Sequence, residues 1–259
     1  MKQKLSIVKI GGNVIEDEHA LDVFLTAFSK LEGLKILVHG GGKLATQLAS
    51  KLGIESKMID GRRITDAETV DVITMVYGGL ANKKIVAQLQ SKGINALGLS
   101  GADGNSIQAH KRPIKEIDYG FVGDIDGINS GLLAHLLTLQ LTPVFCAISH
   151  DGSGQLLNTN ADTIASEISI AMASHYDTTL FYCFEKKGVL LDIKDENSVV
   201  KEIDTTMYQD LLAKGIIADG MLPKLHNCFH ALENKVKKVC LGDVSMLDKN
   251  TELFTTLTL

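Results

Sequence analysis

The sequence predicts an α/β protein with a mostly parallel central sheet. Apolar runs of strand length alternate along the chain with amphipathic segments of helical length, a pattern typical of parallel strands joined by helices. The 259 residues, 45% of them hydrophobic, can bury a substantial core as one large domain or as two fused lobes. The first two apolar runs each end in glycines, whose backbone amides can approach an anion closely.

We expect strands at residues 4–10, 35–39, 94–99, 142–148, 178–183 and 236–241, with helices between them. The longest helical pattern follows the capping-box sequence Thr65 to Glu68 and continues to about Lys92, with an interruption at Gly78 and Gly79. A helix of this length needs a packing partner, such as a second subunit. The glycine-rich residues 101–128 predict a hairpin excursion that could cover a pocket, and a change of lobe is expected around residues 174–178.

Composition excludes several classes of protein. The net charge of −5, without basic runs interleaved with aromatics, argues against a nucleic-acid partner. The four cysteines form no Cys-x-x-Cys pair and lie in or beside apolar stretches, as expected of reduced thiols in the cytoplasm. No signal-peptide pattern precedes the first strand, and polar residues and a proline break the longest apolar stretch, 132–148. We therefore expect a cytoplasmic protein without a membrane span.

The two glycine segments favour phosphate binding. Residues 7–13 read Ile-Val-Lys-Ile-Gly-Gly-Asn, and residues 36–43 read Ile-Leu-Val-His-Gly-Gly-Gly-Lys. A P-loop is excluded, because Leu37 and Leu44 stand where that motif needs its first glycine and its magnesium-binding hydroxyl.

A dinucleotide-binding oxidoreductase is an alternative reading of the second glycine segment. Gly40 to Ala45 satisfies Gly-x-Gly-x-x-Ala, and Asp60 lies at a suitable distance for a ribose contact. Against this reading, these glycines follow the second strand, and the first strand already ends in a glycine pair of its own.

Lys9 interrupts an apolar strand directly before the first glycine pair. A solvent-facing lysine is the simplest explanation, but burial of an ammonium is costly unless it meets an anion, which favours a functional role. Far downstream, Asn158, Asn160 and Asp162 precede a helical stretch. An N-cap explains one of them, and alternate spacing would turn all three to one side of an extended segment. With Lys224, these residues indicate a phosphoryl-transfer site.

Zinc and serine-hydrolase chemistry are not expected. His226 and His230 are four residues apart on a predicted helix, but Asn227 stands where a metalloprotease needs glutamate. Ser100 and Ser153 lack the strand-to-helix elbow and a histidine at a recognisable spacing.

Taken together, these segments resemble the amino acid kinase family, and within it the branch that acts on N-acylglutamates. The resemblance runs nearly end to end. Five ordered motifs carry it: Lys-x-Gly-Gly at 9–12, His-Gly-Gly-Gly at 39–42, Gly-x-Arg-x-Thr at 61–65, Asn-x-Asn-Ala-Asp at 158–162 and Asp-Gly-Met-x-x-Lys at 219–224. Aspartokinases, uridylate kinases and glutamate 5-kinases resemble the chain less, because their first-strand motifs differ.

The resemblance implies a three-layer α/β/α sandwich with two lobes. Residues 1–175 would bind the acylglutamate and form a homodimer, and residues 176–259 would bind ATP. The implied reaction transfers the γ-phosphoryl group of ATP, which arrives with Mg²⁺, to the side-chain carboxylate of N-acetylglutamate in arginine biosynthesis. Such a carboxylate, with a pKa of about 4.3, is already ionised at neutral pH and needs no general base. Positioning and charge stabilisation would carry the catalysis.

The same resemblance implies roles for individual residues. Two lysines would stabilise the transferring phosphoryl group, oriented by one carboxylate: Lys9, Lys224 and Asp162. The implied substrate-binding residues are Gly41, Gly42, Arg63 and Asn158. The implied nucleotide-binding residues are Gly11, Gly12, Asn160, Glu185, Gly188, Ile216 and Ile217. No protein metal ligand is implied, because phosphate oxygens would hold the magnesium ion.

The chain departs from the family pattern at Phe184 and Glu185, where serine or threonine followed by aspartate is usual. This departure puts the local nucleotide contacts in doubt and leaves a non-catalytic sensor as an alternative. Pro223, directly before Lys224, is also unusual, although proline fits the first turn of a helix.

Two further properties are left open by the sequence. Lys111 and Arg112 could meet the extra carboxylate of an N-succinylglutamate, so the acyl group of the substrate is not decided. The chain starts at its first strand, whereas the arginine-inhibited members of the family carry an additional N-terminal helix. We therefore expect a homodimer that arginine does not inhibit.

Overall fold

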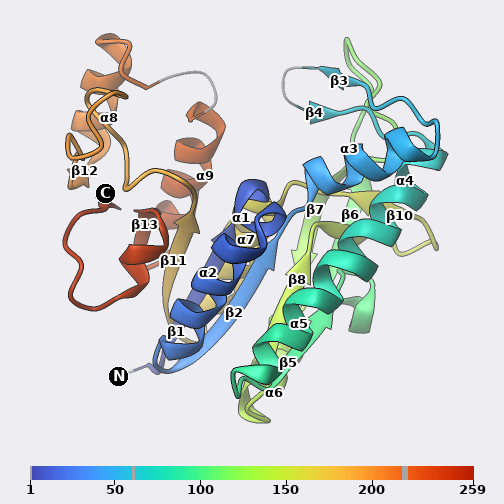
Figure 1. Ribbon diagram of the computed structural model, residues 1–259, viewed down its shortest axis with the longest axis horizontal. Helices are drawn as coiled ribbons and strands as arrows, with labels where there is room; N and C mark the ends of the chain where they lie inside the picture. The colour runs from blue at the N-terminus through green and yellow to red at the C-terminus, as the bar shows by residue number, and fades with distance from the viewer. Residues whose placement is uncertain (1, 60–61, 218–220) are drawn as a thin grey trace.

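An eight-stranded sheet runs through both halves of the molecule, in the order β12-β14-β13-β11-β1-β2-β8-β5 (Figure 1). The computed structural model describes residues 2–59, 62–217 and 221–259, so Asp60, Gly61, Asp219 and Gly220 of the sequence motifs lie outside the described residues. The strands of this sheet are β1 (Lys4–Ile10), β2 (Leu34–His39), β5 (Ala96–Leu99), β8 (Thr142–Cys146), β11 (Asp177–Cys183), β12 (Glu202–Ile203), β13 (Lys238–Gly242) and β14 (Thr255–Leu257).

The predicted strands and their direction agree with this sheet. All of its pairings are parallel except the one between β13 and β14. The strand expected at 142–148 is shorter than predicted, because β8 ends at Cys146 and a separate strand, β9 (Ile148–His150), begins after Ala147. The sheet therefore confirms a mostly parallel α/β fold.

Helices cover both faces of this sheet. They are α1 (Gly12–Glu16), α2 (Glu18–Lys30), α3 (Gly42–Lys51), α4 (Ala67–Ile73), α5 (Asn82–Ser91), α6 (Ser130–Thr138), α7 (Ala161–Ala173), α8 (Thr205–Ala213) and α9 (Leu222–Glu233). The described residues also form two short 3₁₀ helices, η2 (Asp103–Asn105) and η3 (Val244–Leu247).

The side chains of β1 alternate between two hydrophobic cores, as the period of a strand requires. Leu5 and Ile7 join the core that includes α7, whereas Val8 and Ile10 join the core that includes α2 and α5. Figure 1 shows α2 and α5 crossing in front of the strands. The fold is therefore the three-layer sandwich that the resemblance implied.

Figure 1 also shows the two lobes, with β11, β13, α8 and α9 on one side and β2, β8, β5 and α5 on the other. Strand β11 begins at Asp177, within the region where the sequence placed the change of lobe. The assignment of acylglutamate binding to residues 1–175 and of ATP binding to residues 176–259 stays a prediction.

A smaller sheet, in the order β10-β9-β6-β7, lies beside the main one. Its strands β6 (Ile107–Lys111) and β7 (Gly123–Ile128) pair antiparallel, which confirms the hairpin predicted within residues 101–128. Strand β10 (Leu156–Asn158) pairs with β9 and leads into α7. A two-stranded hairpin of β3 (Met58–Ile59) and β4 (Arg62–Arg63) precedes α4.

The long helix is continuous, so the interruption expected at Gly78 and Gly79 is wrong. A π-helix, η1 (Thr74–Ala81), carries the chain from α4 into α5 through both glycines. A glycine inside a helix costs only about 1 kcal/mol, and here Val76, Tyr77 and Ala81 are buried on the same segment. Packing of these side chains therefore outweighs the helix-breaking tendency of the glycines.

The helix also starts one residue later than the capping-box sequence suggests. Asp66 is the N-cap of α4, and its carboxylate accepts a hydrogen bond from the Thr69 amide at 2.9 Å. The hydroxyl of Thr65 instead accepts a hydrogen bond from Asn158, 93 residues later in the chain. No helix in the described part of the chain is long and apolar enough to cross a membrane.

Candidate active site

Three charged side chains from three different elements meet at the end of β1. The Lys9 ammonium lies 2.7 Å from Oδ1 of Asp162, and the Lys224 ammonium lies 2.7 Å from Oδ2 of the same carboxylate. The side chains of the two lysines are 13% and 14% exposed, and that of Asp162 is 18% exposed. The sequence prediction that these three residues act together is consistent with this cluster, which carries a net charge of +1.

The local fold explains the meeting. Lys9 follows Leu5 and Ile7 on the face of β1 that α7 covers, and Asp162 lies in the first turn of α7. Helix α9 packs on α7, where the Ser166 hydroxyl donates to the backbone carbonyl of Asn227 at 3.2 Å. Lys224 lies in the first turn of α9, directly after Pro223, as the tolerance of proline at that position predicts.

The charges of the cluster depend on one another. Burial opposes ionisation of Asp162, but the ammonium groups of Lys9 and Lys224 outweigh it and hold the pKa of the carboxyl far below its usual range. Burial lowers the pKa of Lys9, an effect that the Asp162 carboxylate opposes and that the Lys224 ammonium reinforces. The carboxylate therefore stays ionised at neutral pH and favours the charged form of Lys9.

Two aromatic rings complete the surroundings of Lys224. Its ammonium lies 4.9 Å from the ring centroid of Tyr182 and 5.9 Å from that of Phe184. The buried Tyr182 hydroxyl also donates to the backbone carbonyl of Asp162 at 2.9 Å. The sequence analysis missed Tyr182, although its position at the penultimate residue of an apolar strand, in register with Lys9, was a usable signal.

The two glycine turns lie at the same edge of the sheet. Strands β1 and β2 are parallel neighbours with Ile10 opposite His39, so the glycines that follow them come close together. The Gly11 amide already donates to the backbone carbonyl of Cys183 at 3.1 Å, and α1 begins at Gly12. The Gly11 amide is thus already bonded to the end of β11. An anion at this turn would therefore be bound by the amides of Gly12 and the residues after it.

Gly41 is a position that only glycine fits. Its φ is 155°, and a Cβ at this residue would lie 2.9 Å from Cδ1 of Tyr77, closer than real Cβ contacts. Helix α3 begins at the next residue, Gly42. The turn thereby places the first amides of a ten-residue helix at the end of β2, where the helix dipole favours an anion.

Arg63 is buried beside this turn. Its guanidinium donates to the carbonyl of Gly42 at 2.8 Å, to the hydroxyl of Thr46 at 2.8 Å and to the hydroxyl of Ser56 at 2.8 Å. The structure therefore brings together Gly41, Gly42 and Arg63, three of the four predicted substrate-binding residues.

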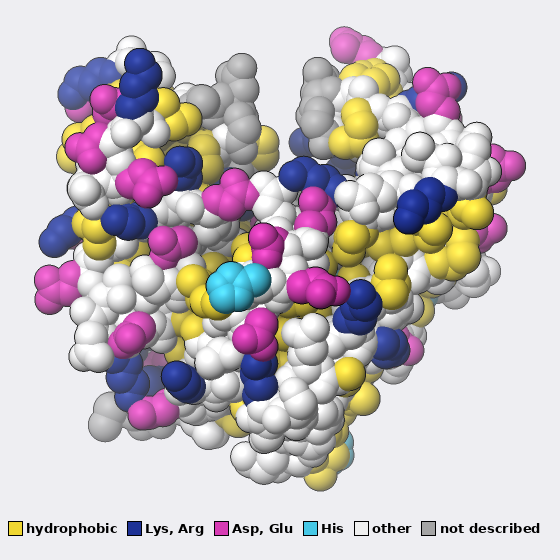
Figure 2. Space-filling model, viewed as in Figure 1, with side chains coloured by type: hydrophobic (Ala, Val, Ile, Leu, Met, Phe, Trp, Pro, Cys, Tyr) yellow, Lys and Arg dark blue, Asp and Glu magenta, His cyan; other side chains and the backbone are white. Residues whose placement is uncertain are grey.

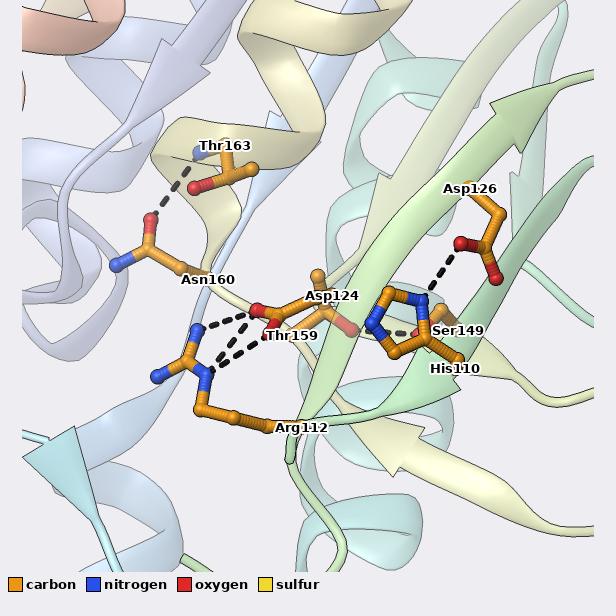
Figure 3. Close-up of polar contacts among 8 residues, drawn as sticks. All are labelled: His110, Arg112, Asp124, Asp126, Ser149, Thr159, Asn160 and Thr163. Carbon is orange, nitrogen blue, oxygen red and sulfur yellow. Dashed lines mark hydrogen bonds and ion pairs between the residues drawn. The ribbon is translucent and has the colours of Figure 1, made fainter. Parts of the chain in front are cut away.

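Asn158, the fourth, lies on β10 and reaches Thr65 beside β4, its Nδ2 donating to the threonine hydroxyl at 3.0 Å. The expectation that Asn158, Asn160 and Asp162 share one side of an extended segment is wrong, because the helix begins at Ala161. Asn160 is the N-cap of α7, and its Oδ1 accepts from the amides of Asp162 and Thr163. Figure 3 shows the contact with Thr163. Capping thus redirects the last residue of the motif toward the lysines.

The predicted nucleotide-binding residues of the C-terminal half lie in different surroundings. Glu185 is exposed in the segment after β11, whereas Gly188 is tightly packed, since a Cβ there would lie 2.5 Å from the Thr255 hydroxyl oxygen. Ile217 is buried in the core that includes α7, and Ile216 packs against the same core. These contacts leave the nucleotide roles as predictions.

A fully buried histidine, His39, supports the second glycine turn; the sequence analysis included it in the His-Gly-Gly-Gly motif but gave it no role. Nδ1 of His39 donates to the Gly40 carbonyl at 2.8 Å, and Nε2 accepts from Nδ2 of Asn82 at 3.1 Å. The same Asn82 amide donates to the carbonyl of Val144 on β8 at 2.9 Å. Burial lowers the pKa of His39 to about 4, so the imidazole is neutral at physiological pH.

The hairpin of β6 and β7 has its own charged pairs (Figure 3). Arg112 binds Asp124 through Nη2 at 2.6 Å and through Nε at 3.1 Å, and Nδ1 of His110 lies 2.6 Å from Asp126. The Lys111 ammonium lies 5.1 Å from the ring centroid of Phe121. Both cations that could meet a second substrate carboxylate therefore already have partners within the hairpin.

This arrangement suits transfer of an anionic group. The ammonium groups of Lys9, on β1, and Lys224, on α9, meet at the Asp162 carboxylate. The two glycine turns at the adjacent strand ends can supply backbone amides to anions. Figure 2 shows the molecule hollowed between its two lobes, on the side where these elements end.

Comparison with known proteins finds a matching family model and relatives that align over nearly the whole chain. The family model described as the amino acid kinase family matches residues 4–243. An acetylglutamate kinase from Phocaeicola vulgatus is 54% identical over 251 residues, covering 97% of this chain and 98% of that protein. An acetylglutamate kinase from Parabacteroides distasonis is 52% identical over 254 residues, covering 97% and 100%. Among solved structures, smu.665 from Streptococcus mutans UA159 superposes with a TM-score of 0.79 at 24% identity, covering 98% of both chains.

Proposed function

The chain belongs to the amino acid kinase family, and on this basis we propose that it phosphorylates the side-chain carboxylate of N-acetyl-L-glutamate with ATP. Relatives with about half of their residues identical over nearly the full chain are acetylglutamate kinases. Kinases of this kind are transferases, and the product, an acyl phosphate, is an intermediate of arginine biosynthesis. ATP is the co-substrate of the proposed reaction.

The cluster of Lys9, Asp162 and Lys224 is the observation that carries the proposal. In phosphoryl transfer, negative charge spreads over the oxygens of the transferring group, and preorganised cations stabilise it. A net positive, partly buried cluster at the edge of the sheet, beside two glycine turns, meets this requirement. A protein that merely binds nucleotide would not need two ammonium groups held on one carboxylate, which argues against the sensor alternative.

Each residue receives a role in this proposal. Lys9 and Lys224 contact the transferring phosphoryl group from two sides, and Asp162 holds both ammonium groups in place. The amides at Gly12 and the following residues receive phosphate oxygens of ATP, and those at Gly41 and Gly42 receive the attacking carboxylate. Asp162 is not a general base, because the substrate carboxylate is already ionised at neutral pH.

The α-carboxylate and the acyl amide of the substrate are proposed to lie beside the second glycine turn, next to Arg63 and Asn158. Arg63 is suited to a carboxylate, because its planar guanidinium can make two parallel hydrogen bonds, and it already lies 2.8 Å from the Gly42 carbonyl. Asn158 donates to the hydroxyl of Thr65, two residues after Arg63 in the chain, and its amide can bind an amide or a carboxylate of the substrate.

The nucleotide is proposed to lie over the C-terminal lobe, against Asn160, Glu185, Gly188, Ile216 and Ile217. We propose Mg²⁺ as the ion that accompanies ATP. In the described part of the chain, no group of three or more histidine, cysteine, aspartate or glutamate residues could hold a metal. The ion would therefore be held mainly by phosphate oxygens.

Acetyl is the proposed acyl group, because the names of the relatives specify it and the two candidate cations for a succinyl carboxylate are engaged. Arg112 is paired with Asp124, and Lys111 lies over Phe121.

A cytoplasmic homodimer is the proposed state of the protein. Two large apolar side chains on η1, Met75 and Leu80, are about half exposed and offer a surface for a second copy.

The experiment is an assay of the purified protein with ATP, Mg²⁺ and N-acetylglutamate, in which hydroxylamine traps the acyl phosphate as a hydroxamate. The wild type should form hydroxamate, and Lys9→Ala and Lys224→Ala should each lower kcat by a factor of about 100 to 1,000, because each removes one charge stabiliser. Lys237→Ala, which removes an exposed surface ion pair with Asp177, is the matched control.

Three other outcomes would redirect the proposal. A higher kcat/KM with N-succinylglutamate than with N-acetylglutamate would contradict the acetyl assignment. Nucleotide binding without hydroxamate from either acylglutamate would favour the sensor instead. Turnover of a nicotinamide cofactor without ATP would support the oxidoreductase alternative.

A further inference from the structure

Tyr77 packs against the second glycine turn, and none of the roles proposed above includes it. It belongs to the π-helix η1, and 5% of its surface is exposed. A Cβ on Gly41 would lie 2.9 Å from Cδ1 and 3.1 Å from Cε1 of the Tyr77 ring. The ring therefore fills the space directly against the Gly41 backbone.

The hydroxyl of Tyr77 reaches the next part of the same turn. A Cβ on Gly42 would lie 3.8 Å from this hydroxyl oxygen, and the Gly42 carbonyl accepts from Arg63 at 2.8 Å. Burial raises the pKa of Tyr77, and the positive charge of the nearby Arg63 guanidinium opposes this rise. One tyrosine thus contacts both the glycine turn and the surroundings of the arginine.

The π-helix explains how Tyr77 reaches this place. A π-helical turn contains more residues than an α-helical turn, so an eight-residue π segment rotates the side chains that follow relative to a regular α-helix. Helices α4 and α5 on either side keep the segment in place, and Val76 and Ala81 are buried on it. Such segments occur frequently at functional sites.

We infer that Tyr77 is a positioning residue for the acylglutamate, because its ring packs against the Gly41 backbone and its hydroxyl lies beside Gly42, whose carbonyl accepts from Arg63. This inference rests on the proposed function. It assigns Tyr77 no contact with the reacting atoms. The nucleotide side of the site contains other residues, so ATP binding should be independent of Tyr77.

The test is a kinetic comparison of Tyr77→Phe with the wild type in the hydroxamate assay. Removal of the hydroxyl should raise the KM for N-acetylglutamate about fivefold, as expected for loss of one buried polar contact, with kcat and the KM for ATP within about twofold. Tyr77→Leu, which also removes the ring, should raise that KM further. Tyr208→Phe is the matched control, because this tyrosine packs on Phe229 in the other lobe.

A double-mutant cycle separates positioning from a general effect on packing. If Tyr77 acts through Arg63, the KM increase of Tyr77→Phe should shrink to less than about twofold in an Arg63→Lys background. Effects that multiply independently in the double mutant would overturn the role through Arg63. Should Tyr77→Leu fail to fold, Tyr77→Phe still decides the question, because it preserves the ring.

The outcomes also separate this inference from the proposed function. Normal kinetics of Tyr77→Phe in an active enzyme would overturn the inference and leave the kinase assignment intact. An equal rise in the KM for ATP would overturn it as well, since the effect would not be specific to the acylglutamate. A wild type without hydroxamate formation would overturn the proposed function and, with it, this inference.

Discussion

Replacing Asp162 by asparagine should destabilise the protein and change its response to pH. The substitution preserves the shape of the side chain but removes the charge that lies 2.7 Å from each of two ammonium groups. At this distance and an effective dielectric constant of about 20, each pair attracts by about 6 kcal/mol before the cost of desolvation. Removing one partner of a buried ion pair usually costs about 3–5 kcal/mol. Because the three side chains remain 13–18% exposed, we expect about 3 kcal/mol.

The enzymatic consequence concerns Lys9. Burial already lowers the pKa of this lysine, and the Asp162 carboxylate is the main opposing influence. In Asp162→Asn the pKa of Lys9 should fall further, so the ammonium that we propose to stabilise the transferring phosphoryl group is lost at a lower pH than in the wild type. As pH rises, the kcat of the variant should therefore begin to decrease at a lower pH than the kcat of the wild type.

Urea denaturation at pH 7 measures the loss of stability, and hydroxamate assays across the pH range measure the kinetic effect. Asp177→Asn is the matched control, because it removes a surface ion pair with Lys237 and should change neither property measurably. Wild-type stability in Asp162→Asn would refute the reasoning. So would a variant whose kcat rises with pH, because such a profile would indicate a group that must lose its proton.

Three other substitutions test the packing around the site by urea denaturation. Because the pKa of His39 is lowered to about 4, its contribution to stability is present above the ordinary histidine range and is lost as pH falls from about 6.5 toward 4. The wild type should lose about 2 kcal/mol more than His39→Gln between pH 7 and pH 5, and equal losses would contradict the shift. Lys35→Met should lower the free energy of unfolding by about 1–3 kcal/mol, because the buried ammonium donates to three backbone carbonyls at the end of α2. An unchanged urea midpoint would contradict this, because it would show that water satisfies these carbonyls in place of the ammonium. Gly188→Ala should cost about 1–3 kcal/mol, since its Cβ would lie 2.5 Å from a hydroxyl oxygen, whereas Gly127→Ala, with no atom within 4 Å, should be neutral.

The sequence predicted the parallel sheet well, because the apolar runs of β1, β2, β11 and β13 are buried on both faces and stand out from their surroundings. It also predicted the strand-end lysine, since Lys9 is the charged residue in the run from Leu5 to Ile10. The prediction was wrong where local propensity opposed packing. Gly78 and Gly79 suggested a break, but the buried side chains of η1 keep the segment helical.

The polar partners could not be predicted, because they join residues that are far apart in the chain. Asn82 contacts His39 across 43 residues, and Asn158 contacts Thr65 across 93. Neither spacing is periodic, and either asparagine alone could have been read as a turn or cap residue. Such contacts become visible only once the order of the strands is known.

Asp162 shows how one local rule and one long-range contact produce the site together. The Asn160 cap begins α7 directly after the motif, so Asp162 lies in the first turn of a helix, where the dipole favours a negative charge. The carboxylate would therefore be stable there with a single ammonium group. The second ammonium gives the cluster its net charge of +1, since Lys9 and Lys224 both lie 2.7 Å from the same group. A partly buried excess of positive charge is costly until an anion meets it, and this cost favours an anionic ligand, such as the phosphoryl group of the proposed reaction, over a neutral one.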